Sequence, residues 1–225
     1  MHKLIAAYIS GRIRNDYEDF LGTGVDLKTE DDMDFFLARY LHRIKGDWYL
    51  GAQGISTNYA IGADGLAGGI LEQIGLVGFD SNGLGLVTEF DSRDNRRNPH
   101  QGQWFVAHNI AYRESLGGDE SFDTFQVNYA GFFPVAEKHV FAVNVRGRWT
   151  DDAPLGGYSS LSLRGYTRGN YLDEHYTHID FEGRFNLTER WGLTAFAGVG
   201  CLYESVSDCG DGEALYPAIG GGGFF

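Results

Sequence analysis

The sequence has no apolar run long enough to cross a bilayer as a helix, which takes roughly 20 residues, so a transmembrane helix is excluded. Basic residues are few: 18 Lys and Arg stand against 31 Asp and Glu, and the net charge of −13 argues against a nucleic-acid-binding surface. Nucleophile elbows, phosphate-binding loops and dinucleotide fingerprints are also missing. We therefore expect no enzymatic activity, no cofactor and no nucleic-acid partner.

Cysteine is nearly absent, with two residues in 225. In an oxidising compartment Cys201 and Cys209 are expected to form a disulfide. The pair lacks further Cys or His residues at zinc spacing, so no metal site is expected. His175 and His178, with two acidic neighbours, resemble a ligand cluster only loosely, and we interpret them as hydrophilic loop and lumen surface.

What the chain has in abundance is glycine and aromatic side chains, with 33 Gly, 16 Phe and 13 Tyr. These residues suit strands and tight turns better than helices. Acidic residues gather in 30–34 and 118–120, which we interpret as solvated connecting segments; the alternative is a cation site facing lipopolysaccharide. The first nine residues have a basic start but no cleavage site, so we interpret them as internal sequence without a signal peptide.

Period-two alternation is the strongest pattern in the chain. In residues 178–187 the positions of one parity are apolar and those of the other are charged or polar; the apolar ones are Ile179, Phe181, Phe185 and Leu187. A strand places these two sets on opposite faces. The apolar face would pack in the core of a soluble β-sandwich or contact lipid in a membrane barrel, and alternation alone does not separate the two.

Strand length and connections favour the barrel. A tilted bilayer crossing takes about 9–11 residues, whereas globular strands average nearer 5–6. We expect strands at 35–44, 47–59, 82–91, 102–112, 123–134, 138–149, 174–187, 191–203 and 214–225. Long connections (60–81, 114–122, 150–173 and 204–213) alternate with short turns, as in outer-membrane barrels. Aromatic residues near strand ends fit interfacial girdles: Trp48, Tyr49, Trp104, Phe132, Phe133, Trp149, Trp191 and Tyr203.

The segment from Phe90 to Trp104 is a turn with a distinctive pattern. Pro99 and Gly102 fix a turn and forbid a helix. Asp91, Arg93 and Asp94 are placed to tie it with charge-assisted hydrogen bonds. The alternative interpretation is an ordinary turn rich in Asp and Asn.

The second distinctive segment is Leu163-Arg164-Gly165-Tyr166, inside the long connection 150–173. A loop that enters a barrel needs glycine for a tight reversal and an anchor for its charge. Arg164 suits a carboxylate, and the inward-pointing Glu182, or Asp180, is the expected partner. The alternative is an exposed loop arginine.

Together these two segments resemble the barrel domain of the outer-membrane assembly factors and bacterial surface antigens (BamA/TamA-like). The resemblance implies that the first is a periplasmic turn and the second an inward-folding loop locked by its arginine. On the strand after Glu182 the family commonly has F-x-D-x-G; Phe196 and Gly200 match, but Gly198 replaces the acid. The second carboxylate contact is therefore expected to be missing.

The resemblance covers residues 82–203 well and 35–81 by pattern alone. Family barrels have sixteen strands and carry soluble repeats upstream, whereas we expect about nine of these strands here, and nothing in this sequence resembles a repeat. The expected fold is all-β, a transmembrane antiparallel β-barrel forming one domain over 1–225. It is expected to be truncated at both ends and therefore not to close alone.

The resemblance implies a non-enzymatic protein of the bacterial outer membrane that inserts or exports polypeptides. Its expected partners are outer-membrane lipid, lipopolysaccharide, and nascent outer-membrane proteins or a passenger domain. Two functional alternatives remain: a barrel that anchors or exports a lipase-like passenger, and a passive channel.

Overall fold

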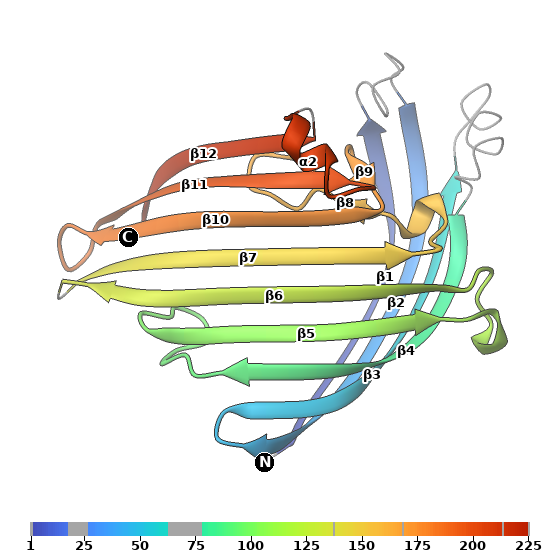
Figure 1. Cartoon of the computed structure of the whole chain (residues 1–225), viewed down its shortest axis with the longest axis horizontal. Helices are drawn as coiled ribbons and strands as arrows, with labels where there is room; N and C mark the ends of the chain where they lie inside the picture. The colour runs from blue at the N-terminus through green and yellow to red at the C-terminus, as the bar shows by residue number, and fades with distance from the viewer. Residues whose placement is uncertain are drawn as a thin grey trace.

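The computed structural model describes residues 2–17, 27–62, 78–136, 138–167, 169–212 and 214–224. Ten strands form one antiparallel sheet in which neighbours along the chain are neighbours in space (Figure 1). These strands are β1 (His2–Tyr17), β2 (Leu27–Lys45), β3 (Trp48–Gly62), β4 (Gly78–Asp91), β5 (Gly102–Tyr112), β6 (Phe122–Val135), β7 (His139–Asp151), β10 (His175–Asn186), β11 (Gly192–Tyr203) and β12 (Leu215–Phe224). The expected all-β antiparallel architecture is confirmed.

The remaining elements lie in connections. β8 (Ser159–Ser160) and β9 (Leu172–Asp173) pair with each other between β7 and β10. Short helical turns are η2 (Glu114–Leu116), η3 (Leu155–Gly157) and α2 (Asp208–Asp211). No helix within the described ranges has the length and apolar character needed to span a bilayer.

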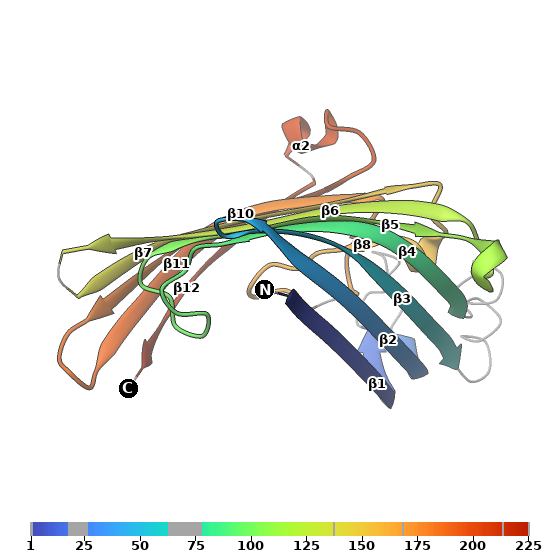
Figure 2. The ribbon, with the colours of Figure 1, turned by 90° about the horizontal axis from the view of Figure 1, so that it is seen from below.

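The sheet is strongly curved and open (Figure 2). Within the described ranges β1 pairs only with β2, and β12 only with β11. Near β1 the curvature is tight enough for Lys3 to cross two strands and reach Glu89 on β4, with 2.9 Å between Nζ and Oε1. The Lys3 ammonium also lies 3.6 Å from the ring centre of Tyr49 on the intervening β3. The sheet therefore has a concave face, on which these side chains lie, and a convex face.

Alternation along the strands sorts side chains between these two faces. On β10, Phe181 and Phe185 are exposed on the convex face, while Asp180 is buried on the concave face. The convex face carries exposed apolar side chains from β1 to β12, among them Leu4, Phe36, Leu50, Leu86, Phe125, Phe141, Phe181, Leu193 and Ile219. The concave face is polar in its middle and apolar toward the ends of the strands, where clusters such as Ala130, Phe132, Val140 and Ala142 lie.

The connections fall on two ends of the sheet as the alternation of long and short segments predicts (Figure 1). The connections after β3, β5, β7 and β11 leave from one end, and those after β2, β4, β6 and β10 from the other. We call these the long-loop end and the short-turn end. The expected inward loop lies between β7 and β10 and runs beneath the concave face (Figure 2).

Two expectations about the first part of the chain are wrong. Within the described residues the sheet has ten strands rather than about nine, because β1 occupies a segment that we interpreted only as lacking a signal peptide. Its apolar residues show no period of two: Leu4, Ile5, Tyr8 and Ile9 are all exposed at the sheet edge. The acidic segment 30–34 was expected in a connection but lies within β2, which begins at Leu27.

The proposed aromatic girdles are only partly right. Trp48 and Trp191 are exposed, and Trp149 on β7 donates a hydrogen bond from Nε1 to the Tyr203 hydroxyl, at 3.0 Å. In contrast, Tyr49 and Phe132 are buried on the concave face, and Trp104 packs against the clusters that contain them. Adjacent residues on a strand point to opposite faces, so Trp48 and Tyr49 cannot share a girdle.

Candidate functional site

The tip of the inward loop is held to the sheet by Arg164. Its Nη2 lies 2.5 Å from Asp180 Oδ1, and its Nη1 donates a hydrogen bond to Glu182 Oε2. Both carboxylates belong to β10 and face the concave side, with side-chain exposures of 9% and 15%. The Arg164 guanidinium also lies 4.0 Å from the ring centre of Phe196 on β11. The structure thus brings Arg164 to both carboxylates considered from the sequence.

The missing family acid at position 198 has a structural explanation. Gly198 pairs directly with Asp180 in the β10–β11 register. A Cβ atom at Gly198 would lie 2.6 Å from Asp180 Cβ, closer than van der Waals contact allows. The absence of a side chain at 198 therefore makes room for Asp180, whose carboxylate contacts Arg164 from the neighbouring strand. Arg164 keeps two carboxylate partners, which the sequence pattern on β11 did not lead us to expect.

Gly165 and Tyr166 complete the tip. Gly165 adopts a φ of 93°, in the left-handed region that favours glycine. The Tyr166 hydroxyl donates a hydrogen bond to the backbone carbonyl of Pro217 on β12, at 2.7 Å. Its ring packs edge-on against Tyr171 and Tyr216. The loop therefore crosses the concave face from β7 as far as β12.

Two arginines that sequence reasoning missed hold the first half of the loop. Arg148 on β7 donates to the Ser159 hydroxyl at 3.0 Å and to the Gly157 carbonyl at 2.9 Å. Arg146, two residues earlier, donates to the Ser162 hydroxyl at 3.2 Å. Both occupy positions of the inward-facing parity on β7, and that alternation is the signal from which they could have been found. The loop is thus held by sheet arginines at its base and by its own arginine at its tip.

The loop also packs against the concave face through apolar side chains. Leu161 and Leu163, which flank Ser162, pack with Tyr176 on β10 and Leu202 on β11 in one buried cluster. Burial of such side chains provides the non-directional part of the attachment. The polar contacts set the register of the loop on the sheet.

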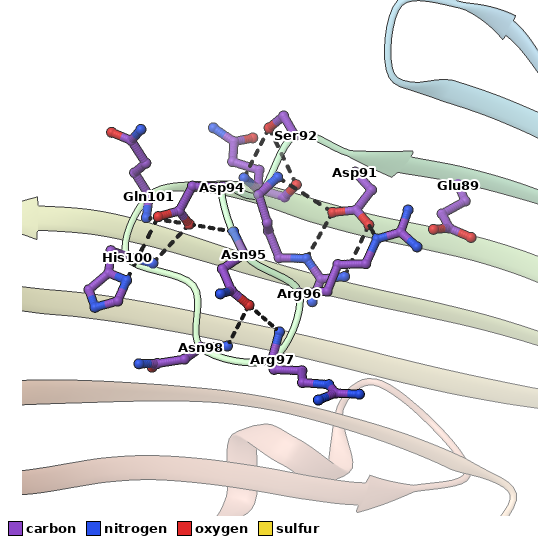
Figure 3. Close-up of polar contacts among 12 residues, drawn as sticks. Glu89, Asp91, Ser92, Asp94, Asn95, Arg96, Arg97, Asn98, His100 and Gln101 are labelled. Carbon is purple, nitrogen blue, oxygen red and sulfur yellow. Dashed lines mark hydrogen bonds and ion pairs between the residues drawn. The ribbon is translucent and has the colours of Figure 1, made fainter. Parts of the chain in front are cut away.

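The turn between β4 and β5 is organised by two aspartates (Figure 3). Asp91, 3% exposed, accepts a hydrogen bond from Arg93 Nε at 2.8 Å and forms an ion pair with Arg96. Asp94 accepts hydrogen bonds from the backbone N–H groups of Asn95, His100 and Gln101. These bonds, foremost that of the His100 N–H, hold the pKa of the Asp94 carboxyl below its usual value.

Pro99 and Gly102 help to fix this turn, as expected from the sequence. Pro99 is buried. Gly102 has a φ of 98°, and a Cβ atom there would lie 2.4 Å from the backbone oxygen of Ser92. All five turn residues singled out from the sequence therefore shape one compact turn.

The turn folds inward rather than away from the sheet (Figure 2). Arg184 on β10 donates from Nη1 to the Pro99 carbonyl at 3.3 Å and to Asn98 Oδ1 at 3.4 Å. Arg184 also donates from Nε to Glu182 at 2.7 Å, and Glu182 is the partner of Arg164. The two segments that carry the resemblance are thus joined through β10 on the concave face, with Pro99 of the turn and Arg164 of the loop 65 residues apart in the chain.

A small cavity of about 280 Å³ lies beside this junction, at the short-turn end. Its lining combines turn residues with concave-face residues of β10, β11 and β12: Asn98, His100, Glu182, Arg184, Thr194 and Phe224. The lining is mixed in charge, because Arg184 and Glu182 are bonded to each other.

The cysteines and the histidines considered from the sequence lie at the long-loop end. Cys201 and Cys209 are joined by a disulfide, with Cα atoms 5.9 Å apart. His178 lies 3.4 Å from Asp180 and contacts the Tyr176 hydroxyl, while His175 lies next to the Thr150 N–H. Within the described ranges no group of three or more His, Cys, Asp and Glu residues is arranged to hold a metal ion.

Comparison with known proteins gives a likeness in fold alone. No protein-family model matches the chain, and no curated protein matches its sequence. Among solved structures it is similar to BamA from Haemophilus ducreyi lacking POTRA domains 1–3, with a TM-score of 0.65 and 8% sequence identity. The match covers 98% of this chain and 52% of the BamA chain, so the chain spans about half the length of its neighbour. The chain therefore has an all-β, antiparallel β-barrel fold of the type seen in BamA, here with an open sheet.

Proposed function

We propose that this chain is a barrel domain of the bacterial outer membrane, with its convex face against lipid and lipopolysaccharide. The support is the division between the two faces. Phe181 and Phe185 are exposed on the convex face, while Asp180 between Ile179 and Phe181 is buried on the concave face. In water an exposed apolar surface of this extent is unfavourable, whereas in a bilayer it contacts the hydrocarbon chains of the lipids.

A pair of positions on adjacent strands tests the membrane orientation. Phe181 on β10 pairs with Val143 on β7, which is the neighbour of Asn144 in the chain. Phe181 and Asn144 therefore lie on opposite faces of the sheet. A nitroxide label attached to cysteine at 181 should collide with lipid-soluble oxygen, while one at 144 should not. Equal oxygen accessibility at the two positions, or a chain that stays soluble without detergent, would contradict a lipid-facing convex side.

We further propose that the function is of the assembly and translocation type, non-enzymatic, with nascent outer-membrane proteins or an exported polypeptide as client. The observation that carries this proposal is the loop tip, where Arg164 bonds to Asp180 and Glu182 on the concave face. A loop held across the concave face braces the sheet from inside. This fits a barrel that handles polypeptides better than a passive channel, because the loop and the inward turn occupy the space that solutes would need.

The function is tested in cells that need this protein for growth and that carry Arg164→Ala in its gene. The expected result is a fall in the amount of folded outer-membrane proteins while the variant itself still reaches the membrane. Arg113→Ala is the matched control, because Arg113 is a loop arginine of similar exposure that pairs with Asp123 away from the concave face. Unchanged outer-membrane protein levels, with loss of one secreted passenger instead, would favour the anchoring alternative.

A further inference from the structure

Two histidines meet on the convex face at the short-turn end, away from the loop and the inward turn. His2 on β1 is directly opposite His42 on β2 in the strand register. Their Nδ1 atoms are 3.1 Å apart, and their ring centres are 4.7 Å apart. Tyr40, two residues before His42 and on the same face, has its hydroxyl 2.6 Å from His2 Nδ1. Three donor atoms from two strands therefore converge at one exposed place.

We propose that His2 and His42 form a binding site for a divalent transition-metal ion such as Zn²⁺ or Cu²⁺, with the Tyr40 hydroxyl beside it. With metal–nitrogen bonds of about 2.05 Å, neighbouring ligand nitrogens lie about 2.9 Å apart in a square-planar site and about 3.3 Å apart in a tetrahedral one. The 3.1 Å between the two Nδ1 atoms falls between these separations. The backbone pairing of β1 and β2 already places the ligands, so binding needs little rearrangement.

The donor set selects the class of ion. Neutral imidazole suits Zn²⁺, Cu²⁺ and Ni²⁺, whereas Ca²⁺ and Mg²⁺ prefer oxygen ligands. An ion bound between the two nitrogens needs the lone pairs of both Nδ1 atoms, so a ring that carries its hydrogen on Nδ1 moves that hydrogen to Nε2 and both imidazoles stay neutral. Water can complete the coordination, because His42 lies three residues before the end of β2, at the short-turn end, where the strands leave the bilayer in the proposed function.

The site could not be found by spacing along the chain. His2 and His42 are 40 residues apart, and zinc motifs in sequences are recognised by short intervals between ligands. Strand pairing brings them together, and the structure shows the pair only because β1 is a strand. The proposal is independent of the concave face and of any role in polypeptide assembly.

Zn²⁺ titration of the folded chain in detergent micelles, followed by calorimetry, tests the site. We expect one ion per chain. His42→Asn should weaken binding by at least about tenfold, a loss that removal of even an outer-shell partner can cause. His100→Asn is the control, because His100 is an exposed histidine in the β4–β5 turn and should not affect binding. Equal Zn²⁺ affinity for the wild type and His42→Asn would overturn the proposal.

Electron paramagnetic resonance with Cu²⁺ gives a second readout that does not depend on affinity. The wild-type chain should show hyperfine coupling to the nitrogens of two imidazoles, and His42→Asn should show coupling to one. Circular dichroism of the variant should be unchanged, because His42 is an exposed side chain and its removal leaves the sheet intact. A wild-type spectrum with a single coupled imidazole would show that His2 and His42 do not share an ion.

Discussion

The guanidinium of Arg184 on β10 donates a hydrogen bond to the backbone carbonyl of Pro99, 85 residues earlier in the chain. Through Nε the same side chain bonds to Glu182, which also accepts a hydrogen bond from Arg164. A continuous polar path thus runs from the loop tip across β10 to the turn after β4. The turn and the loop, which enter the concave face from opposite ends, share this one strand.

The first prediction concerns this path. Arg184→Ala should release the turn while leaving the sheet intact, because the guanidinium is its polar link to β10 in the described structure. A hydrogen bond to a charged group contributes about 1.5 kcal/mol at the weaker end, so the open turn should become about tenfold more populated. The rate of trypsin cleavage after Arg96 and Arg97, followed by mass spectrometry, measures this change.

The control for Arg184→Ala is Arg190→Ala, which removes an exposed arginine from the β10–β11 turn. It should leave cleavage after Arg96 and Arg97 unchanged. Equal cleavage rates in the wild type and Arg184→Ala would mean that the internal bonds of Asp91 and Asp94 alone hold the turn inward.

The second prediction compares two arginines of similar exposure, Arg164 at 39% and Arg113 at 40%. Arg164→Ala leaves Asp180 and Glu182 with fewer partners on the concave face, so the free energy of unfolding should fall by about 1–2 kcal/mol. Arg113→Ala breaks an exposed pair with Asp123 and should cost less than about 1 kcal/mol. Urea unfolding in detergent micelles gives both values, and equal losses would contradict the bracing role of Arg164.

Much of this arrangement follows from period two. Alternation in 178–187 placed Phe181 outward and Glu182 inward, and the structure agrees. The same rule, applied strictly, would have found Arg146 and Arg148 and would have separated Trp48 from Tyr49. It failed on β1, because that edge strand is apolar on both faces and carries no alternation to detect.

Contacts between strands that are distant in the chain could not be predicted from the sequence. No sequence pattern predicts that the turn after β4 folds inward to Arg184, because this contact depends on the curvature of the whole sheet. The sequence offered Glu182 or Asp180 as the partner of Arg164, and it did not predict that both would bond to it. That outcome depends on the register that sets Asp180 opposite Gly198.

The third prediction concerns pH and the turn. The folded-state pKa of Asp94 is lowered by hydrogen bonds from backbone N–H groups, that of His100 foremost. Its ionised form therefore stabilises the turn above the ordinary Asp value of about 3.9, and this contribution is lost as the pH falls through the lower folded-state value. Amide hydrogen exchange of residues 92–101 should be measured between about pH 2 and 5, a range that spans the ordinary pKa of Asp. The turn should open faster at the acidic end of this range.

Asp94→Asn separates the charge from the hydrogen bonds, because an amide oxygen can accept the same N–H groups without titrating. In this variant the opening of the turn, corrected for the intrinsic exchange rate, should vary less with pH in the acidic range than in the wild type, and the remaining dependence should come from Asp91 and its ion pairs with Arg93 and Arg96. If the wild type and Asp94→Asn respond to pH alike, another group controls the turn.

The last prediction restores the acid that the resembled family carries on β11. Gly198→Asp should destabilise this chain rather than strengthen the hold on Arg164, because the new Cβ would lie 2.6 Å from Asp180 Cβ. Overpacking of this kind costs about 1–3 kcal/mol, and two carboxylates side by side repel each other in addition. Gly11→Asp is the control, since a Cβ atom at Gly11 meets nothing within 4 Å.

The double variant Gly198→Asp with Asp180→Gly then moves the carboxylate across the strand pair to the family position. It relieves the contact with the Asp180 side chain, although the Ile179 carbonyl, 2.9 Å from the new Cβ, still limits recovery. The double variant should therefore be more stable than Gly198→Asp alone and less stable than the wild type. If Gly198→Asp alone is as stable as the wild type in urea unfolding, glycine at 198 is not needed to make room for Asp180. The site would then accommodate carboxylates at positions 180 and 198 together.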